Sequence, residues 1–90
     1  MGQVEAFELE GLKLWINSSD HLPPHFHVSR RGQWEMRVFF LECSENNLVF
    51  EIKWSRKGPS AADRAAILGP VLEHRVALMQ EWEQKVCKSN

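Results

Sequence analysis

The spacing of apolar residues changes near Ser60, and this change restricts the chain to a few fold classes. Before Ser60, apolar and polar residues alternate in short segments separated by turn-forming residues, which is typical of strands. Short turns make neighbouring strands antiparallel. The predicted strands are residues 4–9 and 12–16, interpreted as two strands or one bent strand, followed by 25–29, 34–41 and 48–54.

Beyond Ser60 the apolar residues recur at spacings of three, four and seven, which predicts an amphipathic helix over residues 64–85. Residues 60–63, Ser-Ala-Ala-Asp, resemble a capping box at its start. Pro70 has no N–H and its ring clashes with the preceding turn, so we expect the helix to kink or divide at Gly69-Pro70. The predicted fold is α+β: one domain over residues 1–90, with a mostly antiparallel sheet of about four strands packed against this C-terminal helical segment.

Composition excludes several classes of protein. Ninety residues, 43% of them hydrophobic, suit one small core. A formal net charge of −1 excludes nucleic-acid binding through overall positive charge, so any such contact must use a local patch. No apolar run approaches the roughly 20 residues that span a bilayer, and the first residues do not resemble a leader, so we expect a cytoplasmic protein with no membrane partner. Cys43 and Cys87 match no metal-binding spacing and are expected to be free thiols.

Three of the four histidines fall within residues 21–27, around a Pro-Pro pair. The two prolines hold the residues before them in an extended conformation. In the strand that follows, side chains alternate, so His25 and His27 share one face, roughly 6.6 Å apart along the strand. We expect Phe26 and Val28 to be buried against the helix and both imidazoles to lie on an accessible face.

Two chemistries suit such a cluster. Imidazoles near neutrality can take and give a proton, as a metal-independent ribonuclease requires. Alternatively, His21, His25 and His27 can bind zinc or another divalent metal with water in the fourth position, although no cofactor is favoured. A purely structural role, with the imidazoles bonded to nearby carbonyl groups, is the third interpretation. Asp20 either forms an Asx turn or orients the imidazole of His21.

The motif Asp-His, two residues, Pro-His-Phe-His-Val at residues 20–28 resembles the signature of a family of small bacterial proteins whose named members are DhiT-type toxins. These are the toxin halves of type II toxin–antitoxin pairs. The resemblance covers about residues 10–84 and includes the apolar strand before the motif. It also includes His74-Arg75, Leu78 and Trp82 in the helix, while Gly69-Pro70 departs from the uninterrupted helix of the family.

The resemblance implies a toxin that is held inactive by a cognate antitoxin. The first functional hypothesis is that its histidine cluster acts on RNA or a ribosome-associated target, and a homo-oligomer is a further partner hypothesis. A non-enzymatic module that docks a partner on its sheet face or edge is the alternative. Trp54, followed by Arg56 and Lys57, adds an aromatic ring that can stack on a base beside two cations. The candidate catalytic residues are Asp20, His21, His25, His27 and His74. The candidate substrate-binding residues are Arg30, Arg31, Arg37, Lys53 and Arg75.

Overall fold

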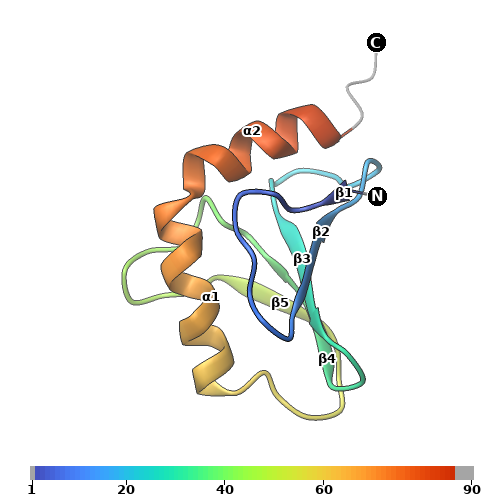
Figure 1. The fold of residues 1–90 in the computed structure, drawn as a ribbon, viewed down its shortest axis with the longest axis vertical. Coiled ribbons are helices and arrows are strands. Elements are labelled where there is room, and N and C mark those ends of the chain that lie inside the picture. Colours follow the sequence, from blue (N-terminus) through green and yellow to red (C-terminus); the bar gives the residue numbers. More distant parts are fainter. Residues whose placement is uncertain (1, 87–90) are drawn as a thin grey trace.

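The predicted α+β class is confirmed by the computed structural model, which describes residues 2–86 (Figure 1). The elements are β1 (Gly2–Gln3), β2 (Lys13–Ile16), β3 (Phe26–Arg30), β4 (Trp34–Val38), β5 (Phe50–Ser55), α1 (Ala61–Glu73) and α2 (Arg75–Lys85). All five strands form one antiparallel sheet in chain order. The sheet therefore has one strand more than the predicted four, and the long segments over residues 34–41 and 48–54 form shorter strands.

The N-terminal segment differs most from the prediction. The strand expected over residues 4–9 is absent, because β1 ends at Gln3 and the chain then forms a loop up to β2. The backbone N–H groups of Glu5 and Ala6 donate to the carboxylate of Glu81 on α2 and not to a neighbouring strand. Local alternation of apolar residues cannot report a partner that lies 76 residues away.

The capping box is present, since Ser60 Oγ accepts from the Asp63 N–H at 3.0 Å and Asp63 Oδ2 accepts from the Ser60 N–H at 3.2 Å. The helical segment does divide into two helices, as predicted, but it divides at His74 and not at Gly69-Pro70. Helix α1 continues through Pro70 to Glu73, and the direction changes at His74, whose φ of −111° and ψ of 24° are not helical. Ala66, whose carbonyl would have bonded to residue 70, is exposed, so water can replace the N–H that proline lacks.

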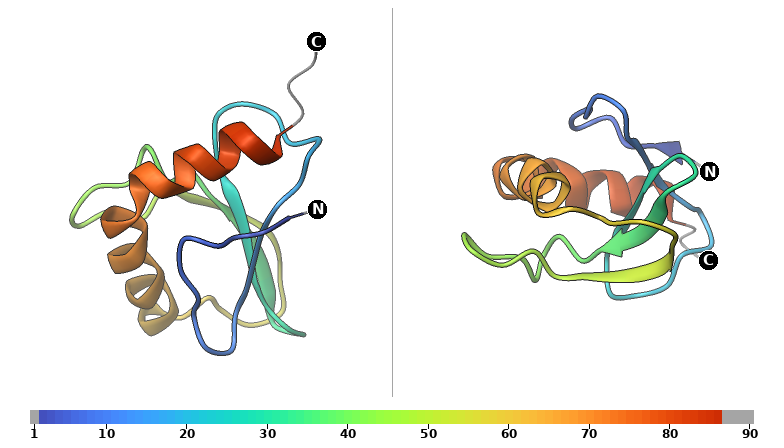
Figure 2. Two further views of the ribbon diagram at one scale, coloured as in Figure 1. Left: turned by 45° about the horizontal axis from the view of Figure 1, so that its top comes forward. Right: turned by 90° about the horizontal axis from the view of Figure 1, so that it is seen from below.

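Both helices lie on the same side of the sheet in the described part of the chain (Figure 2). Their buried residues Ile67, Val71 and Leu78 belong to one core with the inward-facing strand residues, which include Phe26 and Val28. Helix α1 runs along the sheet, whereas α2 crosses one end of it (Figure 1). Neither helix is long and apolar enough to cross a membrane.

Candidate functional site

A tight turn between β2 and β3 places Asp20 beside the histidine pair. The Asp20 N–H donates to the Asn17 carbonyl at 3.1 Å, and the Asn17 N–H donates to Asp20 Oδ2 at 2.9 Å. The turn therefore holds the carboxylate in one orientation. The carboxylate accepts from an N–H three residues before Asp20, whereas an Asx turn uses the N–H two residues after the side chain, so this turn is not the predicted Asx turn. Asp20 does contact an imidazole, but that imidazole belongs to His27 and not to the adjacent His21.

His27 is fixed on three sides. Its Nε2 lies 3.0 Å from each carboxylate oxygen of Asp20 and 3.4 Å from Asn17 Nδ2. Its ring stacks on Trp15 with centroids 5.3 Å apart and planes 15° apart. The Nδ1 atom is buried without a hydrogen-bond partner among residues 2–86.

The protonation of His25 follows from its main-chain contact. Nδ1 lies 2.9 Å from the Pro23 carbonyl oxygen, which can only accept, so Nδ1 carries the proton. In a neutral ring Nε2 then presents a lone pair, and this atom lies 3.7 Å from Asp20 Oδ1. The ring packs against Phe39 and against Trp82 of α2, at 5.6 and 5.4 Å between centroids.

The two imidazoles do share one side of β3, with ring centroids 5.1 Å apart, and Phe26 and Val28 are buried. The prediction that His25 and His27 are accessible is wrong, because their exposed fractions are only 6% and 3%. Alternation identifies the face of a strand but not what covers that face. Here Trp15, Phe39 and Trp82 supply the cover. The family resemblance includes Trp15 and Trp82, whereas nothing in the sequence singled out Phe39.

The three side chains are arranged as metal ligands could be. One ligand atom each from Asp20, His25 and His27 lies within 4.8 Å of the other two. In a tetrahedral site, zinc bonds of ~2.0–2.2 Å separate neighbouring ligand atoms by roughly 3.3–3.6 Å. The observed separations of 3.0 and 3.7 Å between Asp20 and the two imidazoles are close to that range.

A cavity of about 360 Å³ opens beside this group. Asp20, His25 and Phe39 line it together with the exposed loop residues His21 and Leu22. Arg37 and Glu51 also line this cavity, and Arg37 Nη1 donates to Glu51 Oε1 at 2.7 Å. Arg37 is the only predicted substrate-binding residue that lines this cavity in the described part of the chain, and Glu51 was not anticipated from the sequence.

The other candidate residues lie elsewhere, and their contacts are structural. His74 stacks on Phe7 between the two helices, with centroids 5.6 Å apart. Arg75 donates to the Cys43 carbonyl at 2.8 Å and ties α2 to the loop after β4. Lys53 lies 3.5 Å from Glu35, and Arg31 is exposed in the turn after β3.

Arg30 joins β3 to the start of α1 through an ion pair with Asp63 at 2.8 Å. Burial tends to raise the pKa of Asp63, but the Ser60 N–H and the Arg30 guanidinium outweigh it and hold this pKa below its ordinary value. Burial raises the pKa of the Cys43 thiol. Cys43 is a free thiol, as predicted, whereas Cys87 lies outside the described residues.

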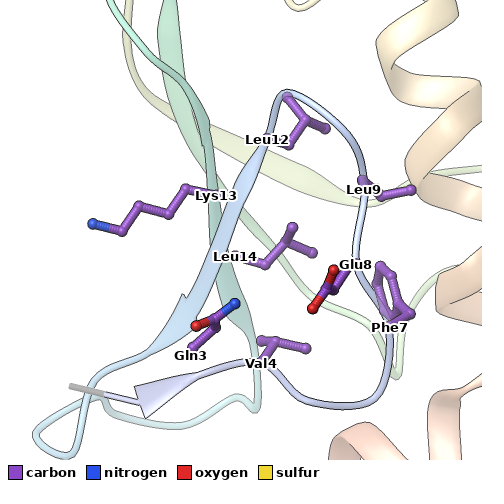
Figure 3. Close-up of a pocket in the computed structure, with 8 residues that line it drawn as sticks. All are labelled: Gln3, Val4, Phe7, Glu8, Leu9, Leu12, Lys13 and Leu14. Carbon is purple, nitrogen blue, oxygen red and sulfur yellow. The ribbon is translucent and has the colours of Figure 1, made fainter.

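A second cavity, of about 250 Å³, lies beneath the N-terminal loop (Figure 3). Val4, Leu9 and Leu14 line it together with Phe7, and its polar lining includes Glu8 and Lys13. None of its lining residues between Gln3 and Leu14 is a histidine or a cysteine, so it offers neither an imidazole nor a thiol for chemistry.

Comparison with known proteins places the chain in a family without assigning an activity to it. Neither a curated protein nor a solved structure matches the chain. The sequence model of one family, described as "Domain of unknown function (DUF4160)", matches residues 11–83, which include β2, the histidine motif and most of α2. Because this match covers most of the 90 residues, the chain belongs to the DUF4160 family.

Proposed function

We propose that Asp20, His25 and His27 bind a divalent metal ion, with zinc as the best fit, and that the chain hydrolyses a phosphodiester with it. Nitrogen and carboxylate ligands suit zinc, and a catalytic zinc site uses three protein ligands and an open position. The third ligand is then Asp20 and not His21, which is exposed on the loop.

The observation that carries this proposal is the contact of His25 Nδ1 with the Pro23 carbonyl, which leaves Nε2 facing Asp20. Because Nδ1 must donate to that carbonyl, Nε2 of the neutral ring presents a lone pair toward the carboxylate. Two electron-rich atoms that face each other inside a protein repel unless a metal ion lies between them or Nε2 takes up a second proton, and a zinc titration separates these two cases. An imidazole whose other nitrogen donates to a main-chain carbonyl is also the usual form of a metal-ligating histidine.

Burial argues for the metal over the metal-independent scheme. General acid–base catalysis needs imidazoles that reach the substrate, whereas His27 is covered by Trp15 and bonded to Asp20. A metal ion held at the edge of the cavity would meet the substrate in their place. Asn17, whose N–H holds the Asp20 carboxylate, would orient this ligand from behind.

Asp20, His25 and His27 would hold the ion and leave one position open for a water molecule. The ion would supply a more acidic water and a positive charge beside the phosphate. In the hydrolysis, the water oxygen would bond to phosphorus, the bond from phosphorus to the leaving oxygen would break, and the leaving oxygen would take up the proton that the water loses. Arg37, which lines the same cavity, retains guanidinium N–H groups beyond the one bonded to Glu51 and can donate them to a phosphate oxygen.

Metal binding is tested by titrating Zn²⁺ into untagged, chelator-treated protein by calorimetry. We expect one equivalent to bind, and expect His25→Gln and Asp20→Asn to lose most of the affinity. His21→Gln is the matched control, because it removes an imidazole from the same loop outside the ligand group. Failure of the wild-type protein to bind, or an equal loss in His21→Gln, would contradict the proposed centre.

The biological role that we propose is that of the toxin in a toxin–antitoxin pair, supported by the resemblance of the motif at residues 20–28. Expression of the chain in bacteria should then arrest growth, and co-expression of the adjacent gene should restore it. Folded His25→Gln His27→Gln protein should not arrest growth. If this variant arrests growth as strongly as the wild type does, the metal centre is not required for toxicity.

A further inference from the structure

Strand register places a second group of side chains on the same sheet face as the metal ligands. One row across the sheet consists of Trp15, His27, Arg37 and Glu51. The next row consists of Lys13, Ser29, Glu35 and Trp54. Two residues along a strand separate the rows by roughly 6.6 Å. The second row therefore lies one step from the row that holds His27.

A cavity of about 630 Å³ lies over the second row. Trp54, Lys13 and Arg31 line it. Trp54 is 42% exposed, and its Nε1–H donates to Glu35 at 3.3 Å, so an accessible indole is held in place. Helix α1 packs against the opposite face of the sheet (Figure 2), and α2 crosses one end of the sheet, where Trp82 contacts His25. No residue of either helix lines this cavity.

Positive charge concentrates at this end of the face. The N–H groups of Arg56 and Lys57 donate to the Gln33 carbonyl, which places both residues beside the turn that carries Arg31. Within residues 2–86, none of Lys13, Arg31, Arg56 and Lys57 forms an ion pair. Glu35, the carboxylate in the cavity lining, is paired with Lys53 and bonded to Trp54. The patch is basic although the whole chain has a net charge of −1.

We infer that this face binds single-stranded RNA, with a base stacked on Trp54 and neighbouring phosphates held by Arg31, Lys13 and Arg56. Open antiparallel sheets with exposed aromatic rings and surrounding cations bind single strands in this manner, because unpaired bases can stack and duplex bases cannot. An acidic peptide would use the cations but would leave the fixed indole without a role. This inference rests on the proposed function and names its substrate class, since a strand lying across both rows carries a phosphodiester toward the cavity beside Asp20 and His25.

The test is fluorescence anisotropy of a labelled 12-nucleotide uridine RNA titrated with the full chain, in excess chelator so that no metal contributes. We expect Trp54→Ala to weaken binding by about 5- to 100-fold, as the loss of one base stack does. Arg31→Glu and Arg56→Glu should each weaken binding and reduce the slope of log affinity against log salt, by about 0.7 for each phosphate that is no longer neutralised. The same RNA annealed to its complement should bind more weakly.

Two matched variants separate this face from general effects. Leu41→Ala removes a side chain with the same exposed fraction as Trp54, and Arg64→Glu reverses a charge on α1, against the other side of the sheet. Both should bind RNA as the wild type does. The inference fails if Arg64→Glu matches Arg31→Glu, if duplex binds as tightly as single strand, or if the face binds an acidic peptide but not RNA. If the chain binds RNA but not zinc, the RNA-binding face is supported and the metal centre is rejected. If the chain binds zinc but not RNA, the metal centre is supported and the RNA-binding face is rejected.

Discussion

Glu81 should contribute more to stability than any other carboxylate on α2, although nothing in the sequence distinguishes it from Glu83. Its side chain is buried and accepts the N–H groups of Glu5 and Ala6, and it also pairs with Lys85 at 2.7 Å. Hydrogen bonds to a charged acceptor contribute ~1.5–3 kcal/mol each, so two of them amount to roughly 3–6 kcal/mol. Glu5 is an exposed residue, so water can replace the carboxylate at its N–H once Glu81 is removed, and this favours the lower end of the range, about 3 kcal/mol.

We therefore expect Glu81→Ala to lower the free energy of unfolding by about 3 kcal/mol, or the melting temperature by roughly 12–24 °C in a domain of this size. Glu81→Gln keeps one acceptor oxygen but loses the charge, so about half of that loss is expected. Urea unfolding followed by tryptophan fluorescence measures both.

Glu83→Ala is the control, because Glu83 is exposed on the same helix and forms no hydrogen bond or ion pair within the described residues. It should change the free energy of unfolding by less than ~0.5 kcal/mol. Hydrogen exchange supplies an independent readout, since the amides of Glu5 and Ala6 should exchange faster in Glu81→Ala than amides of β3 do. Equal stability of Glu81→Ala and Glu83→Ala, or unchanged exchange at residues 5 and 6, would show that the N-terminal loop is held by other contacts.

Three further outcomes are expected. The pKa of Asp63 lies below its ordinary value in the folded chain, so its ionised form stabilises the fold above about pH 4, and this contribution is lost as pH falls through the folded pKa. In Asp63→Asn, the free energy of unfolding, measured by urea titration, should therefore fall less between neutral and acid pH than it does in the wild type. Cys43 should resist a thiol reagent in a Cys87→Ser background until urea unfolds the chain, because burial raises its pKa and denies access; rapid labelling of the native protein would contradict this. Zn²⁺ at 100 times its dissociation constant should raise the free energy of unfolding of the wild type by about 2.7 kcal/mol and should hardly change that of His25→Gln, as measured by thermal unfolding. Equal stabilisation of both proteins would show that zinc binds elsewhere.

The features that the sequence predicted correctly are those with local causes. The antiparallel strands depend on alternation and short turns, and the capping box depends on two residues three positions apart. The features that it did not predict depend on distant partners. The N-terminal loop depends on Glu81, and the burial of His25 depends on Trp82, 57 positions further along the chain. The candidate site follows the same rule. The spacing of residues 25 and 27 predicted that these two histidines share one face, but only the folded turn shows that Asp20 contacts His27 and that His21 lies outside the three candidate ligands.

The position of Glu81 beside Trp82 gives α2 a role beyond packing. Through Glu81 it binds the loop that precedes β2, and through Trp82 it covers the ring of His25. A fragment from β2 to β4 contains all three candidate ligands, yet it lacks the indole that shields one of them from water. The histidine motif therefore cannot be transplanted as a hairpin, and a ligand that pulls α2 away from the sheet would expose His25 and release the N-terminal loop in one movement.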